Sequence, residues 1–365
     1  MARATHSAAL AWRAKDAKSS AVGKAESSFN ERSDTMNKTM RAIVLSEPGG
    51  IDKLVVTDVP APPIQPGHVR IRVKAFGVNE SEVTSRKGLS DPDFTMPRVL
   101  GIECVGVIDE APADSGLKPG QQVATMMGGM GRAFDGSHAE YTVVPATQVI
   151  PFESALSWEV LGALPEMFQT AYGSLTKGLD LKSGQSLLIR GGTSTVGLSA
   201  ATIAKEMGAV VVSTTRRPDR LEMLRDLGVD HPVLESETIA DAVRALFPEG
   251  VDAALELVGG RTLRDTLQAT RIHGAVCFTG ALSDAWTIPD FSPLGFIPFG
   301  VRLTAYGGAA KDLPADVLNR QLQAIEDGRL KVSIARVYHG LEQVRDAHAA
   351  LGSGSMPGKH VVVLD

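Results

Sequence analysis

One stretch of the sequence decides its fold: Arg190-Gly191-Gly192-Thr193-Ser194-Thr195-Val196-Gly197. The run before it, Ser186–Arg190, is short and apolar, as is typical of a buried β-strand. After it, apolar residues recur at helical spacing from Val196 to Met207, and Gly208 ends that pattern. A strand that leads through a glycine-rich turn into a helix predicts a parallel sheet with helices on its faces.

The turn also predicts a site for a dinucleotide. The free N–H groups at the start of a helix attract an anion, and small residues let a pyrophosphate approach the backbone. Ser194 stands where the dinucleotide fingerprint has its middle glycine, but serine is small enough for the turn and its hydroxyl could donate to phosphate. The alternative is a structural turn that binds no ligand. The candidate cofactor-binding residues here are Gly191, Gly192, Thr193, Ser194, Thr195, Val196 and Gly197.

The end of the next predicted strand indicates which dinucleotide binds. An NAD site places Asp or Glu about 20 residues beyond the turn. Here the sequence reads Ser213-Thr214-Thr215-Arg216-Arg217, without a carboxylate. Hydroxyl and guanidinium groups would bind a 2′-phosphate, so these residues extend the cofactor site and predict NADPH rather than NADH. The alternative is that Arg216 and Arg217 form a solvated surface pair, and the sequence does not decide which arginine contacts the phosphate.

The chain shows two kinds of hydrophobic pattern, one in the region that includes this turn and one before it. Strand and helix patterns alternate from about Trp158 to about Gly308, which predicts a doubly wound α/β domain. From Met40 to about Gly120, short β-branched runs are broken by proline and glycine, which predicts a β-rich domain. The last strand, Lys359–Leu364, could return to that β-rich domain. Among the strands predicted outside the alternating region are residues 41–45, 54–59, 68–75, 99–108, 122–126 and 140–144.

Composition excludes several classes of protein. A chain of 365 residues with 43% hydrophobic residues is long enough for two or three packed domains. Its net charge of −5 disfavours generic nucleic-acid binding. Two cysteines cannot form a disulfide framework or a four-cysteine zinc site. No apolar run approaches the ~18 residues of a membrane span.

From Met40 to Asp365 the chain resembles the medium-chain dehydrogenase/reductase superfamily. Several short motifs that follow one another in the expected order carry this resemblance. Within it the chain is similar to the zinc-independent quinone oxidoreductases, the zeta-crystallin-like branch. The resemblance implies a GroES-like β-rich catalytic domain interrupted by a Rossmann domain. Besides the glycine-rich turn, the matching stretches are Gly77-Val78-Asn79, Leu100-Gly101-Ile102-Glu103-Cys104-Val105-Gly106, Lys118-Pro119-Gly120, Ala139-Glu140-Tyr141 and Phe168-Gln169-Thr170-Ala171-Tyr172.

The resemblance also implies that this chain holds no metal. Zinc-dependent members have Cys at the position of Asn79, His at that of Ile102, and a third ligand near Glu166. Asparagine and isoleucine cannot replace a thiolate and an imidazole, and Glu103 with Glu166 alone would make a poor zinc site. Without a Lewis acid, reduction of an electrophilic acceptor is the expected chemistry.

The expected activity is therefore NADPH-dependent reduction of quinones or α,β-unsaturated carbonyl compounds by hydride transfer. By resemblance, Asn79 lies near nicotinamide and substrate and would donate to the developing oxyanion, and Thr170 packs near the nicotinamide ring. Asn79 could instead be a turn-forming residue. Thr84 replaces a tyrosine of many relatives, so solvent is an alternative proton source. The alternative functions are a non-catalytic NADPH-binding protein and a carbonyl reductase of saturated ketones.

The remaining predictions concern organisation. We expect an N-terminal extension over 1–39, a GroES-like catalytic domain over 40–160 and 308–365, and a Rossmann domain over 161–307. The extension is basic and acid-poor at its start, so a mitochondrial presequence is an alternative to a disordered tail of a cytoplasmic protein, or to an upstream start codon. The expected partners are a small-molecule substrate and, by resemblance, a second copy of the chain, without nucleic acid or membrane. Other polar side chains are expected to have no role in the site. We expect His138 to lie in a loop, His273 at the end of a helix, and Arg86-Lys87 as a solvated pair.

Overall fold

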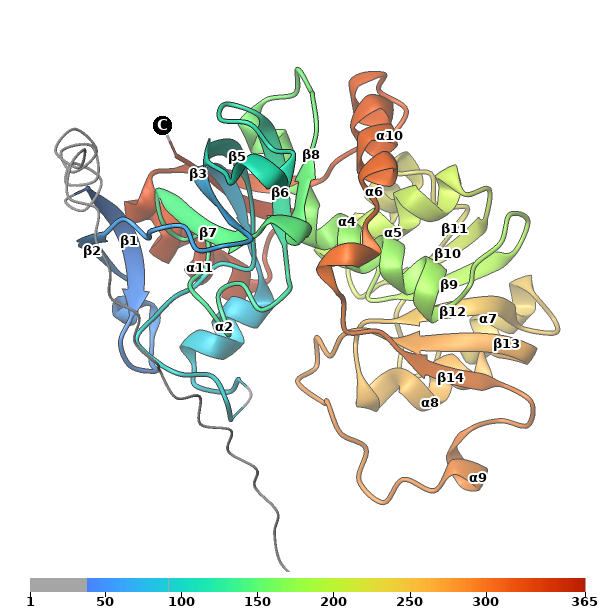
Figure 1. Cartoon of the computed structure of the whole chain (residues 1–365). Coiled ribbons are helices and arrows are strands. Elements are labelled where there is room, and N and C mark those ends of the chain that lie inside the picture. The colour runs from blue at the N-terminus through green and yellow to red at the C-terminus, as the bar shows by residue number, and fades with distance from the viewer. Residues whose placement is uncertain (1–37, 91, 365) are drawn as a thin grey trace, which may run out of the picture. The chain divides into compact units, whose positions relative to one another are not determined.

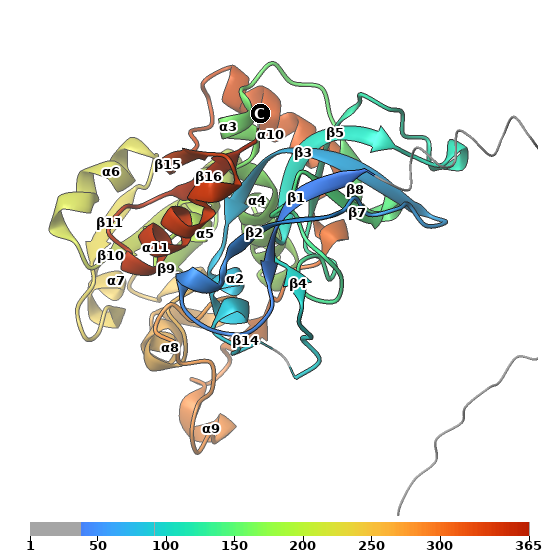
Figure 2. The same cartoon turned by 90° about the vertical axis from the view of Figure 1, so that its left-hand side faces the viewer.

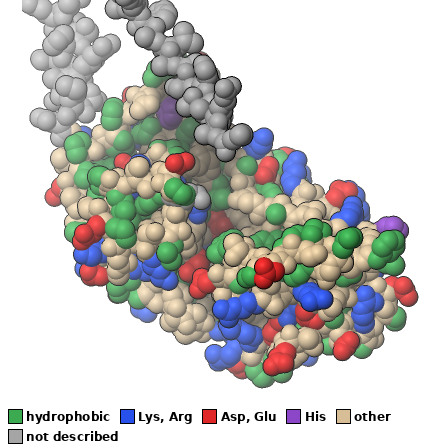
Figure 3. Space-filling model, turned by 90° about the horizontal axis from the view of Figure 1, so that it is seen from below, with side chains coloured by type: hydrophobic (Ala, Val, Ile, Leu, Met, Phe, Trp, Pro, Cys, Tyr) green, Lys and Arg blue, Asp and Glu red, His purple; other side chains and the backbone are tan. Residues whose placement is uncertain are grey.

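The computed structural model describes residues 38–90 and 92–364 of the chain, and within them the strands form three sheets (Figure 1). The predictions made for the first residues, a disordered tail or a presequence, fall on 1–37 and lie outside the described residues. No helix within the described ranges is long and apolar enough to cross a membrane. On the face drawn in Figure 3, acidic and basic side chains are interspersed rather than separated.

The α/β sheet has the strand order β11-β10-β9-β12-β13-β14, and all of its pairings are parallel. Its order reverses beside β9, which is the doubly wound Rossmann arrangement predicted from the sequence. Both faces of β9 are covered, and all five of its residues are buried. The strands are β9 (Ser186–Arg190), β10 (Val210–Thr215), β11 (His231–Leu234), β12 (Val251–Glu256), β13 (Thr270–Phe278) and β14 (Arg302–Ala305). The helices between them are α5 (Thr195–Glu206), α6 (Leu221–Asp226), α7 (Ala240–Leu246) and α8 (Gly260–Gln268).

The β-rich part contains a seven-stranded and a three-stranded sheet. The larger has the order β15-β16-β3-β5-β6-β8, with β7 paired to β3, and the smaller has the order β2-β1-β4. Strand β16 pairs in parallel with β15 and antiparallel with β3, which confirms that the last strand returns to the first domain. The strands are β1 (Thr39–Leu45), β2 (Val55–Pro60), β3 (His68–Val78), β4 (Arg98–Val99), β5 (Glu103–Glu110), β6 (Gln122–Met126), β7 (Tyr141–Pro145), β8 (Val149–Pro151), β15 (Ile334–His339) and β16 (Lys359–Val363).

Helix α4 connects the two parts. Its apolar side chains Leu164, Met167 and Phe168 lie in one core cluster that also includes residues of α5, β5 and β6. It continues directly into one π-helical segment, Ser174–Gly178. Figure 2 shows another helix, α11, next to β15 and β16. The helices outside the α/β sheet are α2 (Glu80–Arg86), α3 (Trp158–Leu161), α4 (Leu164–Gly173), α9 (Pro293–Phe296), α10 (Ala315–Glu326) and α11 (Val344–Ser353).

The predicted strand 99–108 is wrong in one respect, because it is two strands. Residues 100–102 connect β4 of the three-stranded sheet to β5 of the seven-stranded sheet. Gly101 sits at this break with φ of +105°, and a Cβ there would collide with Ser137 Oγ. Glycine is therefore required where the chain departs from the sheet, since other residues rarely adopt this φ.

Two polar residues differ from their predictions, and a third is more buried than a loop residue usually is. His273 does not end a helix but lies inside β13 with φ of +67°, where its N–H donates to the Gly300 carbonyl. Arg86 is not solvated: its side chain is buried and donates to the Gly49 carbonyl. His138 does lie in the loop before β7, but its side chain is fully buried.

Candidate active site

The glycine-rich turn joins β9 to α5 as predicted, and its packing explains two of its glycines. A Cβ at Gly192 would collide with Ser213 Oγ of the neighbouring strand β10. A Cβ at Gly197 would lie 2.6 Å from the carbonyl oxygen of Gly191. Both glycines therefore let β9, β10 and α5 approach each other closely, which brings the start of α5 to the carboxyl edge of the sheet.

The hydroxyl of Ser194 is used inside the turn. Ser194 is the N-cap of α5: its Oγ accepts from the Gly197 N–H at 3.1 Å and donates to the Gly191 carbonyl at 2.8 Å. The prediction that this hydroxyl donates to phosphate is not favoured by that geometry. Among the described residues, the backbone N–H groups of Thr193, Thr195 and Val196 have no hydrogen-bond partner. Free N–H groups at the positive end of a twelve-residue helix fit a dinucleotide pyrophosphate.

The end of β10 contributes a buried hydroxyl group. Ser213, Thr214 and Thr215 are all buried, and the Thr214 hydroxyl accepts from the Gly191 N–H at 3.2 Å. Ser213 Oγ is buried beside Gly192 and finds no hydrogen-bond partner among the residues that the structure describes. A buried polar atom without a partner at the edge of this turn is suited to a polar ligand.

Three arginines follow that strand, and their surroundings differ. Arg217 pairs with Asp219 through two contacts of 3.0 Å. Arg216 has no ion pair or side-chain hydrogen bond within residues 38–90 and 92–364. Arg220 donates to the Ser355 carbonyl at 3.0 Å and lies 3.5 Å from Thr193 Oγ1, so it reaches the glycine-rich turn. The sequence interpretation missed Arg220, although it stands only three residues beyond Arg217.

The predicted catalytic region contains a fully buried lysine at the start of β16. The Nζ atom of Lys359 lies 2.7 Å from Glu103 Oε1 and 3.3 Å from Glu166 Oε2, and it donates to Asn79 Oδ1 at 2.5 Å. Gly77 makes room for it, because a Cβ there would collide with the Lys359 side chain. Burial alone would lower the pKa of Lys359, but the two carboxylates raise it above its ordinary value. Lys359 is therefore a buried ammonium cation.

Asn79 is held at both ends of its amide. Its oxygen accepts from Lys359, and its Nδ2 donates to Glu103 Oε1 at 2.9 Å. Its backbone N–H donates to Glu82 Oε2 at 2.9 Å, which fixes the first turn of α2. The predicted donation from Asn79 to a substrate oxygen stays a prediction, and in this arrangement the amide is engaged with the protein.

Thr170 joins the same hydrogen-bond network from α4. Its hydroxyl donates to Glu166 Oε1 at 2.9 Å, and the Glu166 N–H donates to Glu103 Oε2 at 2.7 Å. The two predicted catalytic residues, Asn79 and Thr170, are thus connected through Glu103 and Glu166. We define Asn79, Glu103, Glu166, Thr170 and Lys359 as the lysine network.

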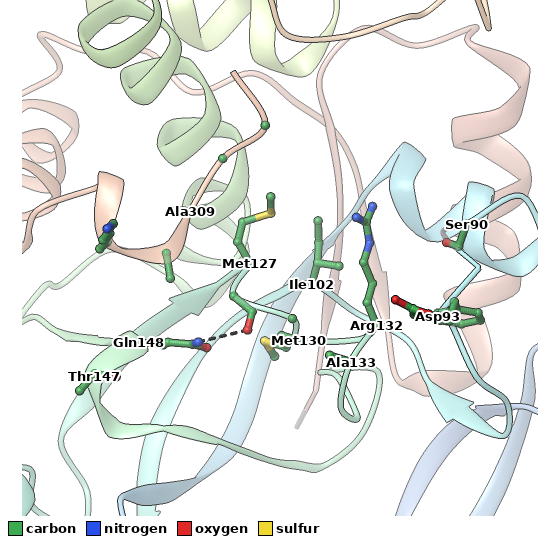
Figure 4. A pocket seen from close by; sticks show the side chains of 17 residues that line it. Ser90, Asp93, Ile102, Met127, Met130, Arg132, Ala133, Thr147, Gln148 and Ala309 are labelled. Atoms are coloured by element: carbon green, nitrogen blue, oxygen red, sulfur yellow. Dashed lines mark hydrogen bonds between the residues drawn. The ribbon is translucent and has the colours of Figure 1, made fainter. Parts of the chain in front are cut away.

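A cavity of about 780 Å³ opens beside this network (Figure 4). Ile102, the residue before Glu103, lines it, and so does Gly308, where a Cβ would lie 3.0 Å from Gln169 Oε1. Met127 and Met130 also line it, from the loop that follows β6. The volume is that of a site for a small organic molecule.

A second buried cluster lies next to the lysine network. Within the part of the chain that the structure describes, Glu82, His138 and His348 form the one group of three side chains that could supply metal ligands, with their ligand atoms within 4.8 Å of one another. His138 Nε2 lies 3.5 Å from Glu82 Oε2, but none of the four imidazole nitrogens has a hydrogen-bond partner there. Burial, with a smaller contribution from His138, lowers the pKa of His348 to about 3, while Glu82 opposes the shift. The sequence could not predict this cluster, because its members lie in distant segments.

Two family models match the chain. The alcohol dehydrogenase GroES-like domain matches residues 65–154, which include β3, β5 and β6. The zinc-binding dehydrogenase family matches residues 195–319, which include α5 and five strands of the α/β sheet.

Individual proteins are similar over longer stretches. Prostaglandin reductase-3 of Bos taurus is 30% identical over 270 residues, which are 68% of this chain and 68% of that protein. A probable quinone oxidoreductase of Leishmania amazonensis is 28% identical over 311 residues, which are 81% of this chain and 88% of that protein. A crystal structure described as an NAD-dependent alcohol dehydrogenase is 28% identical with a TM-score of 0.79, covering 89% of this chain and 100% of that one.

The pKa of His348 generates a prediction about acid stability. Below about pH 6.5 the unfolded chain binds a proton at this imidazole that the folded chain does not bind, so the free energy of unfolding should fall as the pH falls toward 3. His348→Gln removes this contribution. Between pH 6 and 4 its stability should change less steeply than that of the wild type, by up to about 1.4 kcal/mol per pH unit.

Urea unfolding followed by circular dichroism over a pH series measures both slopes. His231→Gln, outside the cluster, is the matched control and should retain the wild-type slope. Equal slopes for His348→Gln and the wild type would contradict this account of the cluster.

Proposed function

Because the chain belongs to the medium-chain dehydrogenase/reductase superfamily, in its quinone oxidoreductase branch, we propose that it is a zinc-independent, NADPH-dependent reductase of quinones or α,β-unsaturated carbonyl compounds. Membership of this superfamily makes the chain an oxidoreductase whose Rossmann domain binds a nicotinamide cofactor. What we propose beyond this is that the cofactor is NADPH, that the acceptor is a quinone or an enone, and that the site holds no zinc.

The buried cation of Lys359 is the observation that carries the proposal. One of the matching families is described as zinc-binding, but the side chains at this site are not those that bind zinc. Asn79 and Ile102 supply no thiolate or imidazole, and the carboxylates of Glu103 and Glu166 both contact the Lys359 ammonium. A zinc ion at these carboxylates would have to displace a buried, hydrogen-bonded lysine.

The acceptor must then be reactive without a Lewis acid. Bound NADPH supplies a hydride, which adds to the β-carbon of an enone or to a quinone, and a proton completes the reduction. The lysine network would fix the walls of the reaction site, since Thr170 and Asn79 are held by Glu166 and Glu103. The donors of the network are all engaged with protein acceptors, so the proton would come from solvent in the cavity.

The surroundings of the glycine-rich turn support NADPH. Thr193, Thr195 and Val196 would bind the pyrophosphate through their N–H groups. Arg216 and the hydroxyl of Ser213 would bind the 2′-phosphate, because both lack partners in the described part of the chain. Arg217 would contribute less, since Asp219 already neutralises it.

The homodimer stays a prediction. Strand β14 is an edge strand of the α/β sheet. Large apolar side chains are exposed in the segment that precedes it, including Trp286, Leu294 and Phe299. Exposed apolar groups of this size are compatible with an interface.

The activity is tested by steady-state oxidation of NADPH with a panel of acceptors. We expect turnover with 1,2-naphthoquinone and trans-2-alkenals, because both are electrophilic without metal assistance. Saturated ketones should react at least about a hundredfold more slowly, since their alkoxide product lacks a stabilising Lewis acid. Preferential reduction of saturated ketones would contradict the proposal, and tight NADPH binding with no turnover would indicate a non-catalytic binding protein.

Cofactor choice is tested by replacing both arginines. Arg216→Ala combined with Arg217→Ala should raise the KM for NADPH by about tenfold or more, because a charged hydrogen bond contributes about 1.5–3 kcal/mol. The KM for NADH should stay unchanged, since NADH has no 2′-phosphate. Arg225→Ala, an exposed arginine of α6, is the control for loss of one surface charge. An unchanged ratio of NADPH to NADH efficiency would refute the assignment of the 2′-phosphate site.

A further inference from the structure

We propose that the cavity beside the lysine network binds acceptors that carry a carboxylate, and that the guanidinium of Arg132 recognises this group. The inference rests on the proposed function and names the substrate class of that same site. It follows from one side chain, Arg132, whose surroundings differ from those of other arginines in the protein.

Most of the cavity wall around Arg132 is apolar. Phe94, Ile102, Met127 and Met130 supply hydrocarbon and thioether surface. Figure 4 shows the Arg132 side chain extended along this wall near Ile102. An aliphatic chain fits such a surface, because methionine side chains adapt to irregular apolar ligands. A cation on an apolar wall then specifies where a charged end of the ligand would lie.

The Arg132 side chain has no hydrogen bond or ion pair within the described residues, and its Nε is buried. Arg86 and Arg98 also have a buried Nε without a partner, but each has a partner for another nitrogen. Arg86 Nη1 donates to the Gly49 carbonyl at 2.9 Å, and Arg98 Nη1 pairs with Asp135 at 3.1 Å. Arg132 is therefore partly desolvated without compensation from the protein, which is costly unless a ligand supplies the partner.

Among the described side chains that line the cavity, positive charges outnumber negative ones. Arg132 and Lys311 line it from two separate segments of the chain. Among the lining residues that the structure describes, Asp93 is the one acidic side chain, and no ion pair joins it to either cation. An anion beside these described side chains would therefore meet net positive charge.

The geometry of the guanidinium favours a carboxylate. Its planar fork donates two parallel hydrogen bonds to a carboxylate, and the interaction strengthens where apolar walls exclude water. A substrate of this class has an electrophilic carbonyl at one end, an aliphatic chain along the methionines, and a carboxylate at Arg132. The cavity volume of about 780 Å³ accommodates a molecule of this size.

A matched pair of probes tests the inference: trans-8-oxonon-6-enoic acid and its methyl ester, which differ only in the charge of the far end. With NADPH, the wild type should show kcat/KM at least about tenfold higher for the acid than for the ester, or ~1.4 kcal/mol of discrimination. Arg132→Met should remove that preference by lowering kcat/KM for the acid while changing that for the ester less than about twofold. Arg132→Lys, which keeps the charge but not the fork, should give an intermediate value.

Isothermal titration of acid and ester into each NADPH-loaded variant provides a readout that needs no turnover. Arg225→Met is the control for removal of an exposed arginine and should bind and reduce both probes as the wild type does. If neither probe is reduced, the proposed function fails, but tighter binding of the acid that Arg132→Met abolishes still supports the inference. Equal binding of acid and ester by the wild type, or equal losses for both in Arg132→Met, would overturn the inference.

Discussion

The ion pair between Lys359 and Glu103 is the interaction on which the rest of this site depends. Both side chains are fully buried, and they come from β16 and β5 of the same sheet. Removing one partner would leave an unpaired charge inside the protein, at a cost of about 3–5 kcal/mol. The remaining bonds of the lysine network, to Asn79, Glu166 and Thr170, follow from the position of this pair.

The network also connects the two halves of the molecule. Glu103 and Lys359 belong to the β-rich part, whereas Glu166 and Thr170 lie on α4, which packs against α5. α5 begins at the glycine-rich turn, so the packed pair α4 and α5 connects the proposed cofactor site to the lysine network. The proposed hydride transfer needs donor and acceptor at a fixed separation, and this continuous packing would hold the two sites in place.

Local patterns are enough to predict most of the α/β part. β9 was predicted with its observed bounds, and α5 begins within a residue of the predicted Val196, because a buried parallel strand and a capped amphipathic helix are visible in short windows. β14 and β15 were missed: they are short, largely unburied strands that alternate poorly. The resemblance correctly indicated the superfamily, whereas the bonds of Ser194 depended on cap geometry that a glycine pattern does not specify.

Most features of the site that the sequence does not indicate depend on contacts between residues that lie far apart in the chain. Lys359 and Asn79 are 280 residues apart, and nothing near either residue signals the other. The same holds for His138 and His348, one predicted only as a loop residue. No sequence pattern marks Arg132 either, because an arginine without a partner can be recognised only once its neighbours are known.

The most direct test of the central claim is the metal content of the active enzyme, measured by plasma mass spectrometry on the same sample that is assayed for turnover. We expect full turnover with zinc below about 0.1 per chain, unchanged by chelators, since Lys359 supplies the only cation that these carboxylates need. Stoichiometric zinc bound at Glu103 and Glu166, with turnover that disappears when it is removed, would contradict the account.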